Sequence, residues 1–157
     1  MRSRPAASPR PSDGFQKVRA DHSLETAEDY VEAISDIVHR RGECRVKHLA
    51  AHMGVSHVTV TRTVSRLQES GLVETEPYRP IRLTAAGERL AADARQRHET
   101  VFRFLIALGV PESDARRDAE GMEHHVGDVT LRRMAQFVQE FVQEFVQEPV
   151  ARGGSTP

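Results

Sequence analysis

The sequence predicts a mainly α-helical protein with one small two-stranded β-hairpin. Three observations predict this fold. Apolar residues recur at helical spacing along most of the 157-residue chain, glycine and proline interrupt the periodic segments at intervals, and two short β-type segments flank a turn at residues 77–80. We therefore expect an N-terminal helical unit that carries the hairpin, followed by a purely helical unit.

The first predicted helix covers residues 26–41. Thr26 can cap its start, with Asp29 three residues later, and Gly42 can end it. The preceding residues 1–23 are rich in proline, serine, arginine and alanine and show little periodicity, so we expect a mobile N-terminal arm. The apolar stripe of the helix contains Tyr30, Ile34, Ile37 and Val38.

Two shorter helices are predicted next, at residues 46–53 and 56–70. Gly54 between them can adopt the left-handed conformation that a tight turn requires. Ser56 can cap the second helix, and Gly71 can end it. The core-facing positions of the second helix follow the spacing i, i+4 and i+7. They are Val60, Val64 and Leu67.

A hairpin completes the first domain. Residues 72–74 and 81–83 are typical of short strands, and the Pro-Tyr-Arg-Pro run at 77–80 predicts the turn between them. Three helices followed by such a hairpin form the winged helix-turn-helix pattern, in which the second helix of the turn enters a DNA major groove. We expect this DNA-binding domain to span residues 24–84.

The second domain is expected to be helical over residues 85–148. It begins with a long helix that Thr84 can cap and that ends near Leu108, before a break at residues 109–111. Another helix carries an acidic and histidine-rich run, and a last helix spans residues 128–148. The inward stripe of the long helix contains Leu90, Ala94, His98, Val101, Leu105 and Leu108.

The last helix contains a Phe-Val-Gln-Glu sequence three times in a row, from Phe137 to Glu148. A four-residue period does not match 3.6 residues per turn, so the phenylalanine stripe drifts around the helix. Two interpretations remain open: the helix packs at a subunit interface, or a tandem duplication only lengthens a helix that frays. We expect residues 149–157 to form a disordered tail.

The net charge of −1 conceals an uneven distribution. Residues 40–83 contain eight Arg and Lys residues and four acidic residues, whereas the rest of the chain is acidic. A local basic surface matters more for phosphate contact than the charge of the whole chain. The expected DNA contacts lie at the start and on the outward face of the second short helix and in the hairpin. They are Ser56, His57, Thr59, Arg62, Thr63, Arg66, Arg79 and Arg82.

Membrane and secreted classes are disfavoured. No apolar run approaches the roughly 18 residues of a membrane-spanning helix, and the N-terminus lacks the apolar segment of a secretory signal. The single cysteine, Cys44, cannot form an internal disulfide, which fits a reducing compartment. We expect a cytoplasmic protein with no membrane partner.

The acidic and histidine-rich run at residues 118–125 predicts a metal site. In a helix, Glu120, Glu123 and His124 share one face, because residues three and four apart are neighbours. His98 interrupts the apolar stripe of the long helix, where a buried imidazole needs a partner. Two carboxylates and two imidazoles can therefore converge, and a metal site beside a DNA-binding unit indicates a metal-sensing regulator.

Asp29 and Glu32 can add two further carboxylates, because they lie three residues apart on the first helix. Plainer interpretations remain: His98 as a hydrogen-bonded core histidine, and the acids as a solvated face. His125 points away from His124 and is left outside the ligand set. Oxygen-rich ligands with imidazole and no cysteine favour Mn²⁺ or Fe²⁺ over copper or thiolate-bound zinc.

At these residues the chain resembles the diphtheria toxin repressor family, and within it the branch of manganese transport regulators. Residues 28–32, 97–99 and 118–125 carry the resemblance, which covers about residues 26–136. The iron-type branch is expected to have methionine where Asp29 stands and cysteine where Glu120 stands. Carboxylates at both positions are the manganese pattern.

The resemblance implies a homodimeric repressor of manganese transport genes that divalent metal activates for binding to a palindromic operator in double-stranded DNA. It implies a C-terminal helical dimerisation domain and no enzymatic activity. It also implies a binuclear site with Mn²⁺ as the cofactor, two ions per subunit, and Fe²⁺ as the alternative. The implied ligands are Asp29, Glu32, His98, Glu120, Glu123 and His124.

Three alternatives stay open at this point. The first is an iron- or zinc-responsive repressor with the same architecture. The second is a hydrolytic metalloenzyme, although the sequence shows no separate nucleophile and no phosphate-binding glycine loop. The third is a metal-independent DNA-binding protein whose acidic cluster is inert.

Overall fold

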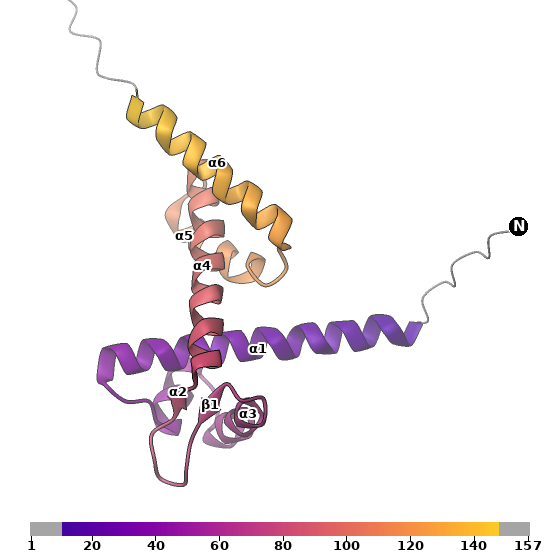
Figure 1. The fold of residues 1–157 in the computed structure, drawn as a ribbon, viewed down its shortest axis with the longest axis vertical. Helices are drawn as coiled ribbons and strands as arrows, with labels where there is room; N and C mark the ends of the chain where they lie inside the picture. Colours follow the sequence, from indigo (N-terminus) through magenta and orange to yellow (C-terminus); the bar gives the residue numbers. More distant parts are fainter. Residues whose placement is uncertain (1–10, 148–157) are drawn as a thin grey trace, which may run out of the picture. The chain divides into compact units, whose positions relative to one another are not determined.

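A computed structural model of the chain describes the backbone of residues 11–147 and the side chains of residues 22–142. It confirms the mainly helical fold with a small antiparallel hairpin (Figure 1). The chain divides into two compact units, of which the first ends at Ala92 and the second begins at Asp93. The elements are α1 (Pro11–Arg41), α2 (Val46–Met53), α3 (His57–Glu69), β1 (Val73–Glu74), β2 (Arg82–Leu83), α4 (Ala85–Ala107), α5 (Glu112–Met122) and α6 (Asp128–Gln147).

Helix α1 begins at Pro11, so the expected start at Thr26 is wrong. Proline suits the first turn of a helix, because its missing N–H has no partner there. Thr26 does not cap the helix, because its hydroxyl donates to the carbonyl of His22 one turn earlier, at 2.8 Å. Residues 11–23 of the expected mobile arm are therefore helical, and residues 1–10 lie outside the described part.

The core of the first unit lies between α1, α2, α3 and the hairpin. Helices α2 and α3 and the hairpin all lie on one side of α1 (Figure 1). The expected helices at residues 46–53 and 56–70 are confirmed within one residue. Gly54 ends α2 with φ +68°, as the tight turn requires. Val38 of the predicted apolar stripe of α1 is 38% exposed, so it is not part of the buried core. The buried residues include Tyr30, Ile34, Ile37, Leu49, Val60, Val64, Leu67, Val73 and Ile81.

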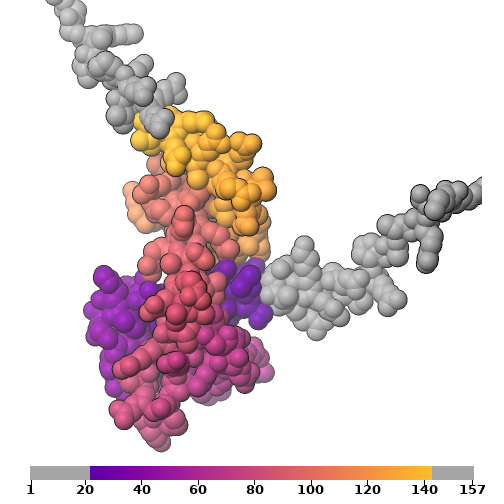
Figure 2. Space-filling view, viewed as in Figure 1, coloured from indigo at the N-terminus to yellow at the C-terminus, as the bar shows by residue number. Residues whose placement is uncertain are grey.

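The hairpin pairs Val73 with Leu83 and Glu74 with Arg82. Its tip projects from the rest of the unit (Figures 1 and 2). The residue before β2 is tied to the segment before α2, because the N–H of Ile81 donates to the carbonyl of Cys44 at 2.8 Å. Burial raises the pKa of the Cys44 thiol to about 11, so the thiol stays neutral at physiological pH.

Helix α4 begins as predicted. The hydroxyl of Thr84 accepts from the N–H of Gly87 at 3.1 Å and donates to the carbonyl of Gly71 at 2.7 Å. The same hydroxyl thus caps α4 and ties it to the end of α3. The expected inward position of Leu108 is wrong: the helix ends at Ala107, and Leu108 is 55% exposed.

The second unit packs α4 from Asp93 onward against α5 and α6. Phe137 of α6 lies edge-on to Phe104 of α4, with ring centroids 5.5 Å apart, and stacks on Phe141 at 6.2 Å. The first phenylalanine of the Phe-Val-Gln-Glu repeats therefore contacts α4, and the second stacks on the first. The side chain of Phe145, the end of the helix at Glu148 and the tail 149–157 lie outside the described residues. The buried core consists of Val101, Leu105, Ala115, Ala119 and Met134.

Among the described residues, no helix is both long and apolar enough to cross a membrane.

Gly87→Ala is expected to destabilise the protein by about 1–3 kcal/mol, as overpacking does. A β-carbon on Gly87 would lie 2.1 Å from the carbonyl oxygen of Leu72, so the start of α4 would have to shift. Urea unfolding measures the effect. Gly121→Ala is the matched control, because no described atom lies within 4 Å of its β-carbon. Helix propensity then predicts a gain of up to about 1 kcal/mol, and a Gly87→Ala protein as stable as this control would contradict the packing argument.

Candidate metal centre and nucleic-acid interface

Three of the six expected ligands meet in the second unit. His98 lies on α4, Glu120 on α5, and Glu123 directly after α5. One ligand atom from each lies within 4.8 Å of the other two. The Nδ1 atom of His98 is 2.8 Å from Oε2 of Glu123 and 3.8 Å from Oε1 of Glu120.

The end of α5 shapes this cluster. The helix ends at Met122, earlier than a continuous helix through His125 would. Glu123 keeps helical angles, with φ −57° and ψ −35°, and its N–H donates to the carbonyl of Ala119. Glu120 and Glu123 therefore still point to the same side. His125 lies in the turn that follows, where its N–H donates to the carbonyl of Met122 at 3.0 Å.

His124 lies beside the cluster. Its Nε2 atom is 3.5 Å from Oε1 of Glu123, and its side chain is 11% exposed. Glu123 therefore has an imidazole near each of its two carboxylate oxygens. His124 thus lies next to the cluster of His98, Glu120 and Glu123, and its part in a metal site stays a prediction.

Burial differs sharply across the cluster. The side chain of Glu123 is 2% exposed, that of His98 is 23% exposed and that of Glu120 is 73% exposed. A buried carboxylate requires a compensating cation or hydrogen-bond donors. The cluster therefore offers two carboxylates and an imidazole, with Glu123 on the buried side and Glu120 on the solvent side. Such oxygen and nitrogen donors suit a divalent cation that prefers these ligand atoms.

Asp29 and Glu32 belong to the other compact unit. They lie three residues apart on α1, with Asp29 exposed and Glu32 half-buried. The structure describes each unit by itself, so their part in the metal site stays a prediction.

The expected DNA-reading helix is α3, and its start is fixed by Ser56. The hydroxyl of Ser56 accepts from the N–H of Thr59 at 3.1 Å, which confirms the predicted cap. His57, Thr59, Arg62 and Arg66 are exposed, whereas Thr63 is half-buried. The helix therefore presents cationic and hydroxyl side chains to solvent while its apolar stripe is buried.

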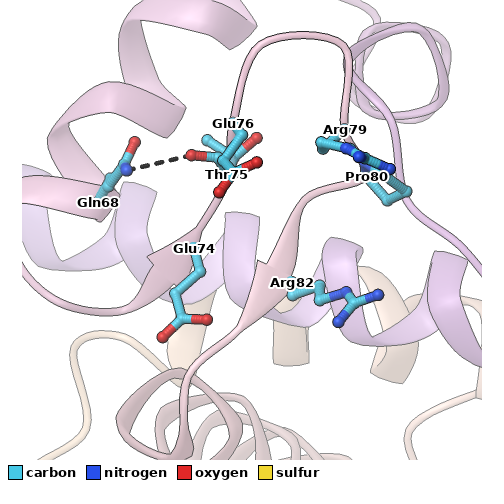
Figure 3. A pocket seen from close by; sticks show the side chains of 7 residues that line it. All are labelled: Gln68, Glu74, Thr75, Glu76, Arg79, Pro80 and Arg82. Carbon is cyan, nitrogen blue, oxygen red and sulfur yellow. Dashed lines mark hydrogen bonds between the residues drawn. The ribbon is translucent and has the colours of Figure 1, made fainter.

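Arg79 and Arg82 lie in the hairpin and line a hollow of about 500 Å³ (Figure 3). The amide of Gln68 on α3 donates to the carbonyl of Thr75 at 3.2 Å and connects the helix to the hairpin there. Glu74 and Glu76 line the same hollow, so the surface is of mixed charge.

A second hollow of about 490 Å³ contains residues that the sequence interpretation missed. It lies among the start of α2, one face of α3 and the hairpin tip. The α3 residues in it follow helical spacing from His57 onward, a second outward stripe that periodicity could have revealed. The missed residues include Arg45, Lys47, Thr61, Ser65 and Gln68.

A winged-helix unit joined to a helical unit with a carboxylate–imidazole cluster defines the class of metal-dependent DNA-binding regulators. Family profiles agree with both halves. Residues 22–81 match the iron dependent repressor N-terminal DNA binding domain. Residues 84–149 match the iron dependent repressor metal binding and dimerisation domain. The chain therefore belongs to the iron-dependent repressor family, the family of the diphtheria toxin repressor.

Curated relatives cover most of the chain. It is 48% identical over 128 residues to the transcriptional regulator MntR of Escherichia coli O6:H1. The aligned region covers 82% of this chain and 83% of that protein. It is 37% identical over 112 residues to the HTH-type transcriptional regulator MntR of Lysinibacillus sphaericus, covering 71% and 81%. These relatives are named as transcriptional regulators, which agrees with the family assignment.

Solved structures agree with the fold. The structure of the manganese regulator SloR matches with a TM-score of 0.63 at 29% identity over 72% of this chain. A manganese-dependent transcriptional repressor in complex with manganese matches with the same TM-score, identity and share. The chain spans about half the length of these two solved chains, 53% and 52%.

Ser56→Ala is expected to destabilise the protein by about 1 kcal/mol, because the first turn of α3 loses its side-chain acceptor. Ser56→Asp restores an acceptor and is expected to stay close to wild type. Thermal unfolding of the three proteins measures the difference. Equal stability of the alanine and aspartate variants would show that the cap contributes nothing.

Proposed function

We propose that this chain is a manganese-responsive transcriptional repressor that binds double-stranded DNA as a homodimer. The observation that carries the proposal is the cluster of His98, Glu120 and Glu123. It lies in the domain that matches the metal binding and dimerisation profile, on a chain 48% identical to an MntR regulator. The regulated genes are proposed to encode manganese transport, and the site of action is the cytoplasm.

The donor atoms support a hard or borderline metal. Carboxylate and imidazole ligands without thiolate suit Mn²⁺ and Fe²⁺. The position of Glu120 supports manganese, because the iron-type branch is expected to have cysteine there. The manganese regulators among the relatives favour the same metal over the iron- or zinc-responsive alternative.

The complete ligand set is proposed from the sequence pattern and the family resemblance. Asp29 and Glu32 would join His98, Glu120, Glu123 and His124 and hold two ions per subunit. Two bound divalent cations would neutralise the four carboxylates, which otherwise repel one another. Relief of that repulsion would favour the dimers whose two α3 helices are spaced to read successive major grooves, about 34 Å apart.

The DNA interface is proposed to consist of α3 in the major groove and the hairpin on the adjacent backbone. Arginine can donate two hydrogen bonds to guanine, and the methyl group of threonine suits thymine. A symmetric dimer implies a palindromic operator. The proposed contacts are Ser56, His57, Thr59, Arg62, Thr63, Arg66, Arg79 and Arg82.

Mn²⁺ is expected to tighten operator binding by about 5–150-fold, the usual range of a coupling between two sites. His98→Ala is expected to remove most of this response, because a central ligand is lost. His125→Ala is the matched control, since that exposed histidine lies in the turn after α5 and outside the proposed ligand set. Fluorescence anisotropy of labelled DNA with and without Mn²⁺ measures the response. Equal wild-type affinity in chelator and in Mn²⁺ would instead favour the metal-independent alternative.

Arg62→Ala and Arg66→Ala are expected to weaken DNA binding and to leave the Mn²⁺ titration unchanged. Loss of a phosphate contact lowers the slope of log affinity against log salt by about 1, whereas loss of a base contact costs about 1–3 kcal/mol. Arg40→Ala is the control, because Arg40 is paired with Asp36 at 3.1 Å on α1. A variant of α3 that lost manganese binding would contradict this separation of roles.

A further inference from the structure

Arg45 connects the start of α2 to the tip of the hairpin. Its Nε and one terminal nitrogen donate to the two carboxylate oxygens of Glu43, at 2.7 and 3.1 Å. Its other terminal nitrogen donates to the main-chain carbonyl of Tyr78 at 3.2 Å. These contacts lie within the first compact unit, and the bond to Tyr78 spans 33 residues of sequence.

The hairpin tip has an uncommon backbone conformation. Tyr78 has φ +67°, in the left-handed region that residues with a side chain rarely adopt. Its side chain is 97% exposed, so packing of the ring does not hold it. Within the tip, the N–H of Arg79 donates to the carbonyl of Glu76 at 3.0 Å. The bond from Arg45 anchors this strained tip to the body of the unit.

The charge of Arg45 is already compensated. Its hydrogen bond and charge hold the pKa of Glu43 below its ordinary value, and the carboxylate in turn raises the pKa of Arg45. Glu43 occupies two of the guanidinium donors in a fork geometry, and the Tyr78 carbonyl occupies a third. An arginine engaged in this way is better suited to hold the hairpin than to neutralise a DNA phosphate.

We propose that Arg45 is a positioning residue for DNA recognition. Glu43 orients the guanidinium group, the guanidinium holds the carbonyl of Tyr78, and the neighbouring Arg79 is thereby presented to DNA. The effect of Arg45 on DNA binding rests on the proposed function. Its effect on the hairpin rests only on contacts within the first unit.

Amide hydrogen exchange of the metal-free protein without DNA tests the anchor directly. Arg45→Lys keeps the charge but loses the planar fork, and Glu43→Gln removes the carboxylate that orients it. Both are expected to accelerate exchange of the Arg79 amide about two- to tenfold, the range set by the loss of one ordinary hydrogen bond. Arg41→Ala is the matched control, an exposed cation at the end of α1 that lies outside both hairpin hollows. Exchange at Arg79 as slow as in wild type in both variants would overturn the proposal.

The DNA affinity of Glu43→Gln also distinguishes two roles of Arg45, a direct phosphate contact and positioning of the hairpin. If Arg45 contacts phosphate, removal of the neighbouring negative charge tightens DNA binding, because repulsion is lost and the cation is released. If Arg45 positions the hairpin, the same variant binds about two- to tenfold more weakly, as expected for the loss of one ordinary hydrogen bond. The probe is a 30-base-pair duplex, about the size of an operator with two half-sites, selected from a random library by the wild-type protein in Mn²⁺.

Tighter binding by Glu43→Gln overturns the positioning role. Weaker binding together with faster Arg79 exchange supports it, and circular dichroism checks that each variant is folded. Failure of the selection to recover any duplex that the wild-type protein binds in Mn²⁺ would contradict the proposed function. The exchange experiment would still decide whether Arg45 anchors the hairpin, so the two failures are distinguishable.

Discussion

A carboxylate buried against an imidazole is the interaction on which the functional end of the second unit depends. Glu123 is 2% exposed, and its Oε2 atom lies 2.8 Å from Nδ1 of His98. Removal of a carboxylate from water costs several kcal/mol unless a cation or hydrogen bonds compensate. The early end of α5 after Met122 places Glu123 there while Glu120 stays on the same side. Helix termination, burial and ligand convergence are therefore one structural feature.

The first unit meets a different constraint, because it must hold a two-stranded hairpin that has little core of its own. Isolated hairpins are marginally stable in water. Here the open end is held by the bond from the N–H of Thr84 to the carbonyl of Leu72. Ile81, just before β2, is held by its bond to Cys44, and the tip is held by Arg45. The hairpin is thus anchored at both ends by main-chain acceptors, and the exposed faces of its residues stay available for DNA.

The sequence was sufficient where local signals and tertiary packing agree. Gly54, Ser56 and Thr84 each end or cap a helix where the local pattern predicts it, so the sequence predicts α2, α3 and α4 within a residue of their bounds. It was insufficient where one side chain has two possible roles. The hydroxyl of Thr26 can cap a helix or donate to a carbonyl one turn back, and periodicity does not choose between them. In the site, i, i+3 spacing grouped Glu120 with Glu123, but it could not reveal that only Glu123 is buried.

The difference in burial between the two carboxylates bears on metal selectivity. Intrinsic affinity rises from manganese towards the later transition metals, so a manganese regulator must select by geometry and donor type. Glu123 lies between two imidazoles, whereas Glu120 is 73% exposed. At the proposed site, Glu123 would supply a fixed oxygen donor and Glu120 an adjustable one. An adjustable oxygen tolerates the higher coordination numbers of hard cations. A thiolate at the same position would favour softer metals, so a carboxylate at residue 120 suits the proposed response to manganese.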